Sequence, residues 1–441
     1  MENDYGVPTA PIVTARFADY VERDCQSHGM ALRFTYPPYP VGWVSRKTLQ
    51  GYIEGNDPVT GVPIMEEIIN ALTEPLTDVE KKFKARKRPQ RERLLEPDTE
   101  ENLHRLFLEN GWTDGMPIVL PTEERVAEML TGTDHAPDEY VGMMSVTTHE
   151  ERLQYTVEKC AVIAVMAGCR PEHFPVILAL GASGRPSMPS STTSFASMMV
   201  VNGPVRNEIG MNSGLGALSP VNYANSVIGR AWTLMSINLG DMRPGATFTA
   251  SLGTTINYNN LCCAENEEQS PWKPFHVRKG YKAEESTVSL FRGWNAITLG
   301  MAPSKTTREV ALRARGIGMG MSFTYLIDPL VAKSLKEEGY DDPSKLSEWI
   351  LDEIISSFKP PEPAGRPEPA RRPEFARRPE MVNFIVVGGE MNPFWVATDF
   401  SHFQTVVIDP WIPKTGIKKD ARPLRMPEPV TCKDGSCGIQ L

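Results

Sequence analysis

The chain is poor in cysteine and has no long apolar run. Only 7 Cys occur among 441 residues, and this odd number in a long chain does not fit a disulfide scaffold. The most apolar stretch, 160–181, is interrupted by Arg170, Glu172 and His173, so it falls short of the roughly 18 apolar residues of a membrane span. The acidic, polar start lacks the features of a signal peptide. We therefore expect a cytoplasmic protein with reduced thiols and no membrane partner.

A basic excess and the common nucleotide-binding motifs are also missing. The net charge of −9 argues against nucleic acid as a partner, because phosphate binding requires clustered Lys and Arg. Glycine-rich segments at 181–184, 214–216 and 316–320 do not combine GxGxxG spacing with a suitably placed acidic residue, and no GxxxxGK[ST] loop occurs. We therefore predict no nucleotide cofactor.

Length and apolar periodicity predict an α/β fold with several parts. We expect a mixed sheet flanked by helices, and a small N-terminal α/β unit that is completed by the C-terminal segment. The expected divisions are a partial α/β unit at 1–75, a charged linker or helix at 76–104, a main α/β body at 105–358, a Pro- and Arg-rich spacer at 359–380, a strand unit at 381–413, and a cysteine-containing tail at 414–441.

Several individual elements can be assigned from local patterns. Apolar residues at helical spacing predict a helix over 64–73. Thr122 is a candidate N-cap for a helix over 123–130, and an apolar helix is expected over 156–167. Apolar runs predict strands at 118–120, 382–387 and 405–408. Between 181 and 260, Gly, Ser, Thr and Asn dominate, which favours either close approach of the backbone to a ligand or a loop-rich surface.

Thiol, carboxylate and imidazole groups gather between residues 262 and 276. Such side chains bind metals, attack electrophiles and transfer protons. Successive residues of an extended segment face opposite sides, so only one of Cys262 and Cys263 can face a given pocket. We expect Cys262 to be a thiolate or metal ligand, Glu265 a ligand or proton carrier, and His276 a base or ligand. Alternatively, the cysteines are buried apolar residues and the Glu-Asn-Glu-Glu run begins a helix.

Two further groups of residues are candidates for binding or redox chemistry. Arg206 can grip a substrate carboxylate through two hydrogen bonds, and Asn212 and Ser213 can add neutral ones; the alternative is that they stabilise loops. In the tail, Cys432 and Cys437 can form a disulfide, carry reducing equivalents or bind a soft metal, or they are incidental thiols of a terminus.

Several motifs together resemble the UGSC-like (selenoprotein) domain family and its associated body domain. They cover Tyr5-Gly6-Val7-Pro8-Thr9, Gly111-Trp112-Thr113-Asp114-Gly115-Met116-Pro117, Asn202-Gly203-Pro204-Val205-Arg206, Asn212-Ser213-Gly214, Ala264-Glu265-Asn266-Glu267-Glu268 and Ser270-Pro271-Trp272 with His276-Val277. The family's selenocysteine-Gly-Ser-Cys signature implies a chalcogen redox centre. The nearest match here is Asp434-Gly435-Ser436-Cys437, with Asp in place of selenocysteine. Either the signature is lost, or the tail brings Cys437 back to the N-terminal unit.

Three functions follow from these patterns. The first is a thiol-dependent oxidoreductase or lyase acting on a small carboxylate-bearing molecule. Cys262 is then the thiolate, Glu265 and His276 tune it and move protons, and Cys437 is a resolving thiol.

The second function is a metal-dependent enzyme in which Cys262, Glu265 and His276 bind Zn or Fe, because mixed sulfur, oxygen and nitrogen ligands suit those metals better than Mg. The third is a non-catalytic subunit or binding protein, motivated by the missing selenocysteine. A partial N-terminal unit would expose apolar surface, so we also expect a homo-oligomer.

Overall fold

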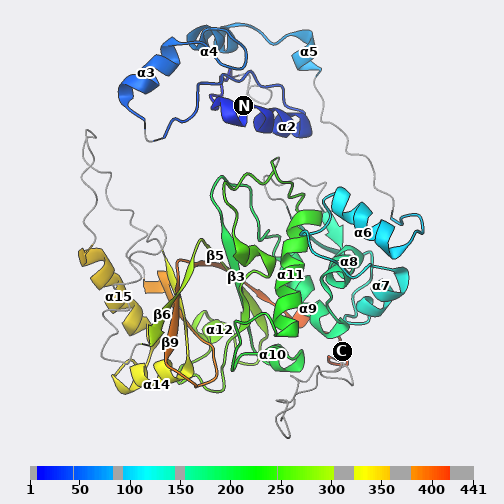
Figure 1. The fold of residues 1–441 in the computed structure, drawn as a ribbon, viewed down its shortest axis with the longest axis vertical. Helices are drawn as coiled ribbons and strands as arrows, with labels where there is room; N and C mark the ends of the chain where they lie inside the picture. Colours follow the sequence, from blue (N-terminus) through cyan, green and yellow to red (C-terminus); the bar gives the residue numbers. More distant parts are fainter. Residues whose placement is uncertain are drawn as a thin grey trace, which may run out of the picture. The chain divides into compact units, whose positions relative to one another are not determined.

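The computed structural model describes residues 7–42, 44–82, 93–144, 154–245, 247–301, 322–357 and 379–417. Figure 1 shows the chain, which divides into two compact units, residues 1–97 and 98–441. Among the described residues, no helix is both long enough and apolar enough to cross a membrane.

The unit at 1–97 is built from short helices around a small core. These are the 3-10 helix η1 (Ala15–Phe17) and the helices α2 (Ala18–His28), α3 (Arg46–Glu54), α4 (Ile64–Thr73) and α5 (Asp78–Lys81). The helix predicted over 64–73 is confirmed with the same bounds. Near residues 10–13 the described backbone forms only an isolated bridge between Ile12 and Thr35. Arg33 connects α5 to this unit by donating from Nε to Glu80 Oε1 over 2.7 Å.

In the described residues of the unit at 98–441, the strands form one two-stranded and two four-stranded sheets. In the first four-stranded sheet the order is β10-β5-β3-β4, and in the second it is β6-β9-β7-β8. Each of these two sheets has one parallel pair, β3 with β4 and β7 with β8, beside antiparallel pairs. The predicted mixed α/β class is therefore confirmed. The strands are β1 (Tyr140–Met143), β2 (Gln154–Thr156), β3 (Ala196–Asn202), β4 (Cys262–Ala264), β5 (Thr287–Gly293), β6 (Ala296–Met301), β7 (Phe323–Ile327), β8 (Val382–Val386), β9 (Phe394–Thr398) and β10 (Ser401–Val407).

Helices cover the outer faces of both large sheets. On one side lie α8 (Val157–Ala167), α9 (Phe174–Ala182) and α11 (Tyr223–Asn238), and on the other α14 (Pro329–Glu337) and α15 (Pro343–Ser357), as Figure 1 shows. The other α-helices in the described part of this unit are α6 (Glu100–Glu109), α7 (Glu123–Leu130), α10 (Val205–Glu208) and α12 (Phe275–Arg278). Thr122 caps α7 by accepting from Arg125 N, as predicted.

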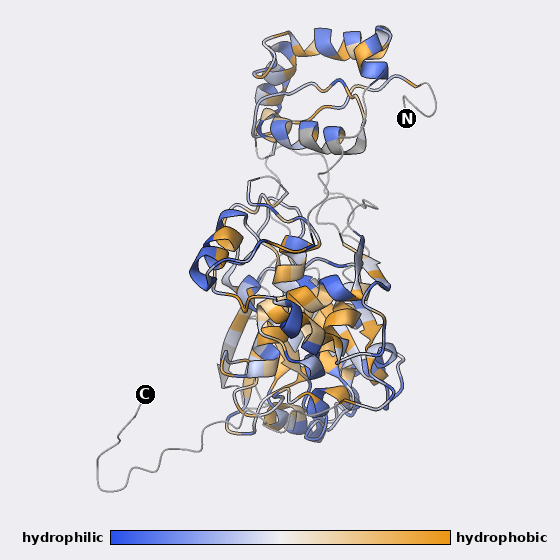
Figure 2. Cartoon of the chain, turned by 90° about the vertical axis from the view of Figure 1, so that its right-hand side faces the viewer, coloured by the Kyte–Doolittle hydropathy of each residue, from blue (hydrophilic) through white to orange (hydrophobic). Residues whose placement is uncertain are grey.

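The two large sheets pack face to face, which gives four layers. Along β3, Met199 and Val201 belong to the core against α8, α9 and α11, whereas Met198 and Val200 face the second sheet. Along β7, Phe323 and Tyr325 face α14 and α15, and Leu326 faces the first sheet. Because successive side chains of a strand alternate, both faces of these strands must be apolar. Figure 2 shows this apolar interior.

The C-terminal strands belong to this unit. Residues 382–407 supply β8, β9 and β10. Strand β8 pairs with β7, β9 pairs with both β6 and β7, and β10 pairs with β5. The expectation that a C-terminal segment completes the N-terminal unit is therefore wrong for these residues. β8 is buried along its whole length, which fits a strand that is covered on both faces in the second large sheet. The tail at 418–441 lies outside the described residues.

Candidate functional site

Cys262 and Cys263 lie on β4 and face opposite layers. Cys262 belongs to the core against the helices, and Cys263 to the core between the sheets. At Cys262 the neighbouring helix comes very close, because a Cβ built on Gly229 of α11 would lie 2.9 Å from the Cys262 Cβ. Glycine at this position permits the contact between α11 and β4.

Its surroundings make the Cys262 thiol a poor nucleophile. The residue is 5% exposed, and burial, with Cys263 nearby, raises the pKa of the thiol well above its usual value. The reactive form of cysteine is the thiolate, and among the residues that the structure describes no cation lowers this pKa. These surroundings match the alternative in which Cys262 is a small apolar core residue.

Glu265, immediately after β4, is buried in a polar network at the carboxyl ends of β3 and β4. Glu265 Oε2 accepts from Asn202 Nδ2 and from Phe275 N, each over 2.6 Å. Arg278 Nη2 lies 3.7 Å from Oε1. Burial raises the pKa of this carboxyl, although Arg278 and the two donors partly oppose the shift. Glu265 faces the side of Cys263, opposite to Cys262.

Arg206 is occupied by carboxylates of the chain itself. Its Nη2 donates to Glu268 Oε1 over 2.6 Å, and its Nε lies 3.3 Å from Glu267 Oε1. The hydrogen bond from Arg206 lowers the pKa of Glu268 to about 2. The guanidinium group that was expected to bind a substrate carboxylate thus binds Glu267 and Glu268 instead, and Arg206 is buried.

His276, on α12, is fully buried, and neither ring nitrogen has a hydrogen-bond partner among the described residues. No three His, Cys, Asp or Glu side chains in the described part of the chain are grouped to hold a metal ion. In particular, Cys262 and Glu265 face opposite sides of β4, so the expected set of Cys262, Glu265 and His276 does not fit one Zn or Fe ion.

The other sequence candidates stabilise turns or lie outside the described residues. Asn212 donates from Nδ2 to Asn222 Oδ1 over 2.8 Å, and its own Oδ1 accepts from Gly214 N. Ser213 contributes a backbone oxygen that accepts from Gly388 N. This agrees with the alternative of loop stabilisation. Cys437 falls in the 418–441 segment, which is not described.

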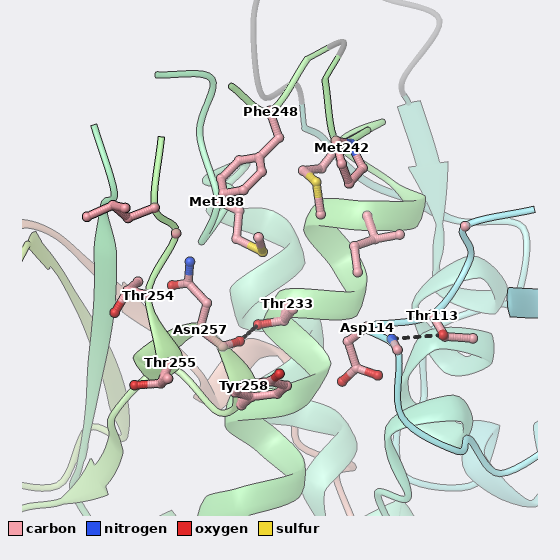
Figure 3. Close-up of a pocket in the computed structure, with 16 residues that line it drawn as sticks. Thr113, Asp114, Met188, Thr233, Met242, Phe248, Thr254, Thr255, Asn257 and Tyr258 are labelled. Carbon is pink, nitrogen blue, oxygen red and sulfur yellow. Dashed lines mark hydrogen bonds between the residues drawn. The ribbon is translucent and has the colours of Figure 1, made fainter. Parts of the chain in front are cut away.

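A cavity of about 590 Å³ lies beside α11, and Figure 3 shows its walls. Its apolar lining comes from Met188, Ile237, Met242 and Phe248, with the 252–258 segment closing another side. The turn at 111–115, which contains Asp114, forms a further wall of the cavity. Pockets for small molecules have this size and this mixture of many apolar and few polar groups.

The 111–115 turn is held against α11 by an ion pair. Arg230 donates from Nε to Asp114 Oδ2 over 2.8 Å and from Nη2 to Asp114 Oδ1 over 2.9 Å. Gly111 and Gly115 have φ values of +64° and +84°, a backbone conformation that glycine adopts without a steric penalty. Two glycines around Asp114 therefore shape this wall.

The opposite wall is the 3-10 helix η4 (Thr255–Tyr258), which is attached to α11 by hydrogen bonds. Thr233 Oγ1 donates to Asn257 O over 2.6 Å, and Asn260 Nδ2 donates to Thr233 Oγ1 over 2.7 Å. Asn257 Nδ2 donates to Phe195 O over 3.2 Å. These bonds fix the position of Asn257 in the wall.

Asn257 Oδ1 is a buried acceptor without a partner. The residue is 6% exposed and lines the cavity, and its Oδ1 has no hydrogen-bond partner among the described residues. The bond from Nδ2 to Phe195 O fixes which end of the amide is the oxygen. A buried acceptor left without a donor costs about 1–3 kcal/mol, so a donor from a bound molecule or water would be favourable here.

The sequence candidates missed this cavity. Asn257, Thr233 and Tyr258 lie within the Gly-, Ser-, Thr- and Asn-rich stretch at 181–260, whose composition favoured either close approach of the backbone to a ligand or a loop-rich surface. Asp114 lies in a motif that carries the family resemblance. What the sequence lacked was a signal that joins 111–115, 188 and 233–258 in space.

Comparison of the chain with family models, with curated proteins and with solved structures found no match. The resemblance to the UGSC-like family therefore stays a prediction from the motifs.

Proposed function

We propose that this chain is a small-molecule-binding protein whose ligand occupies the cavity between α11, the 111–115 turn and the 252–258 segment. The observation that carries the proposal is the cavity of about 590 Å³ with a buried, unpartnered amide oxygen in its wall. It corresponds to the binding-protein hypothesis from the sequence. Any reaction catalysed by the chain is proposed to take place in this cavity.

The enzyme hypotheses at residues 262–276 are alternative proposals with less structural support. A thiol-dependent oxidoreductase or lyase needs an accessible thiolate, but burial raises the pKa of the Cys262 thiol. A metal-dependent enzyme needs ligands that converge, but Cys262 and Glu265 face opposite sides of β4. A carboxylate-bearing substrate needs a free cation, but Arg206 is paired with Glu267 and Glu268.

The test is to fill the cavity from its rim. Thr255 is an exposed residue of the lining, so Thr255→Trp adds an indole group at the mouth without replacing a core side chain. We expect compounds that raise the unfolding temperature of the wild type in a screen of small molecules to bind at least about tenfold more weakly to this variant, because the added ring occupies their volume.

The matched control is Glu337→Trp, which adds the same ring on the exposed side of α14 and away from the residues that line the cavity. Ligand affinities should be unchanged in this variant. If ligands bind Thr255→Trp as tightly as the wild type, they do not use this cavity and the proposal is wrong.

We also propose a homo-oligomer, supported by an apolar stripe on α4. Met65, Ile69 and Leu72 are spaced to share one face of the helix, and each is 44% exposed or more. Sedimentation equilibrium of the wild type should give more than one chain per particle, and Ile69→Glu should shift it towards the monomer. Gln50→Glu on α3 is the charge control, and a monomeric wild type would refute the proposal.

A further inference from the structure

The cavity offers no cation to a ligand. No Lys, Arg or His is among the described residues that line it, and its one charged side chain is Asp114. The carboxylate of Asp114 already accepts two hydrogen bonds from Arg230. An anionic ligand would therefore lose its hydration without gaining a counter-ion, which is costly in a partly apolar site.

The apolar part of the cavity favours an aromatic ring. Met188 and Met242 supply two thioethers and Phe248 an aromatic face, and Figure 3 shows these three side chains on the same side of the cavity. Thioether sulfur makes favourable contacts with aromatic rings, and aromatic pairs gain energy beyond the area they bury. Flexible methionines also adapt to a flat ligand.

The polar part of the cavity favours a ligand that carries a hydrogen-bond donor. Asn257 Oδ1 is the buried acceptor without a partner, while the Nδ2 group of the same amide is used by Phe195 O. Thr233 Oγ1 donates to Asn257 O, so its own proton is also used. A ligand that carries an N–H or O–H group can satisfy Asn257 Oδ1, whereas a ligand with only acceptors leaves it unpaired.

We propose that the cavity binds a neutral aromatic molecule whose ring N–H or O–H donates to Asn257 Oδ1, with the ring packed against Met188, Met242 and Phe248. This rests on the proposed function and narrows it, because it replaces the carboxylate-bearing molecule expected from the sequence with an uncharged hydrogen-bond donor. Asn257 is then the residue that selects among aromatic ligands of equal size.

The experiment compares three probes by calorimetry or ligand-observed NMR on the full chain. Indole has two fused rings and an N–H donor, benzofuran has the same rings with oxygen in place of N–H, and indole-3-carboxylate adds a negative charge. We expect indole to bind about fivefold to tenfold more tightly than benzofuran, the effect of one hydrogen bond. We expect indole-3-carboxylate to bind at least about tenfold more weakly than indole.

Two variants locate these effects. Thr255→Trp should abolish binding of indole and benzofuran alike, and Asn257→Leu should remove the preference for indole while benzofuran still binds. Should Asn257→Leu fail to fold, the ratio of the two affinities in the wild type still decides the matter.

Equal affinities for indole and benzofuran, tighter binding of the carboxylate, or no binding of any of the three probes would overturn the inference. The broader proposal fails separately, when ligands from the unbiased screen bind Thr255→Trp and the wild type equally.

Discussion

Arg230 and Asp114 are joined by two parallel hydrogen bonds of 2.8 and 2.9 Å, across 116 residues of sequence. The guanidinium also donates to Pro117 O over 2.7 Å. The pair is largely buried, with side-chain exposures of 17% for Arg230 and 4% for Asp114. A bidentate arginine pair fixes both distance and orientation, so this contact sets where the 111–115 turn stands against α11.

Breaking this pair should loosen one wall of the cavity. Asp114→Asn removes the charge and leaves the Arg230 guanidinium buried without a counter-ion, which costs about 3 kcal/mol in the free energy of unfolding. Urea unfolding followed by circular dichroism measures the loss. Glu109→Gln is the control, because it removes a carboxylate whose pairing with Arg105 is 3.9 Å long and exposed, and it should change stability by less than about 0.5 kcal/mol. Equal effects of the two variants would contradict this account.

Cys262 should resist thiol reagents in the folded protein. Burial, with Cys263 nearby, raises the pKa of its thiol, so neither access nor a thiolate is available at neutral pH. Labelling with iodoacetamide, followed by mass spectrometry of the peptide that contains Cys262, should give modification only after denaturation. Cys25, in the other compact unit, serves as a buried comparison. Rapid labelling of Cys262 at pH 7 would restore the thiol mechanism.

The contact between α11 and β4 should depend on Gly229. A Cβ at this position would lie 1.9 Å from Asn259 O and 2.9 Å from the Cys262 Cβ, so Gly229→Ala forces backbone to move and should cost about 3 kcal/mol or more. Gly51 lies in α3 with nothing near its would-be Cβ, so Gly51→Ala should stabilise its helix by about 1 kcal/mol. Thermal unfolding of both variants checks the opposite signs.

Acid stability should depend on the Glu268–Arg206 pair. Because the hydrogen bond from Arg206 lowers the pKa of Glu268 to about 2, from an ordinary value near 4.5, the folded state binds this proton less readily than the unfolded state. The stabilisation is therefore complete above pH 4.5 and is lost as the pH falls towards 2. Glu268→Gln should flatten that part of the stability–pH curve, measured by chemical denaturation at each pH. Glu128→Gln, at an exposed site on α7, should leave the curve unchanged.

Local sequence patterns predicted those elements whose signals are local. The helices at 64–73 and 123–130 and the strand at 382–387 agree closely with α4, α7 and β8, because helical spacing, an N-cap and an apolar run need no distant partner. The strand expected at 118–120 is not formed: Val119 N donates to Met166 O at the end of α8, so this segment bonds to a helix end and belongs to no described sheet.

Among the described residues, the longest helix is α11, and its burial on nearly all sides concealed it in the sequence. Sixteen residues form α11, yet the sequence around it contains many small polar residues and suggested loops. A helix in contact with other elements on nearly all sides shows no amphipathic stripe. Its residues Thr233 and Ser236 are buried, and their hydroxyl groups donate to backbone oxygens. In the sequence alone, such polar residues indicate positions exposed to solvent.

The candidate site could be predicted only in part for the same reason. Alternation along an extended segment correctly placed Cys262 and Cys263 on opposite faces, but it could not say that each face is closed by a further layer. The cavity assembles a turn, a helix and a loop through Asp114, Thr233 and Asn257, and the contacts that join them are tertiary. Their residue types alone are ordinary for turns.

The order of strands has a consequence for the growing polypeptide. In the sheet β6-β9-β7-β8, strands β6 and β7 have no neighbour until β8 and β9 have been made. In the other sheet, β5 pairs with the earlier strand β3 on one edge, and its second edge stays unpaired until β10 has been made. All three late strands come from residues 382–407. A nascent chain that has just passed residue 357 on the ribosome therefore carries strand edges that nothing yet pairs with, and such edges favour aggregation until residues 382–407 have been made.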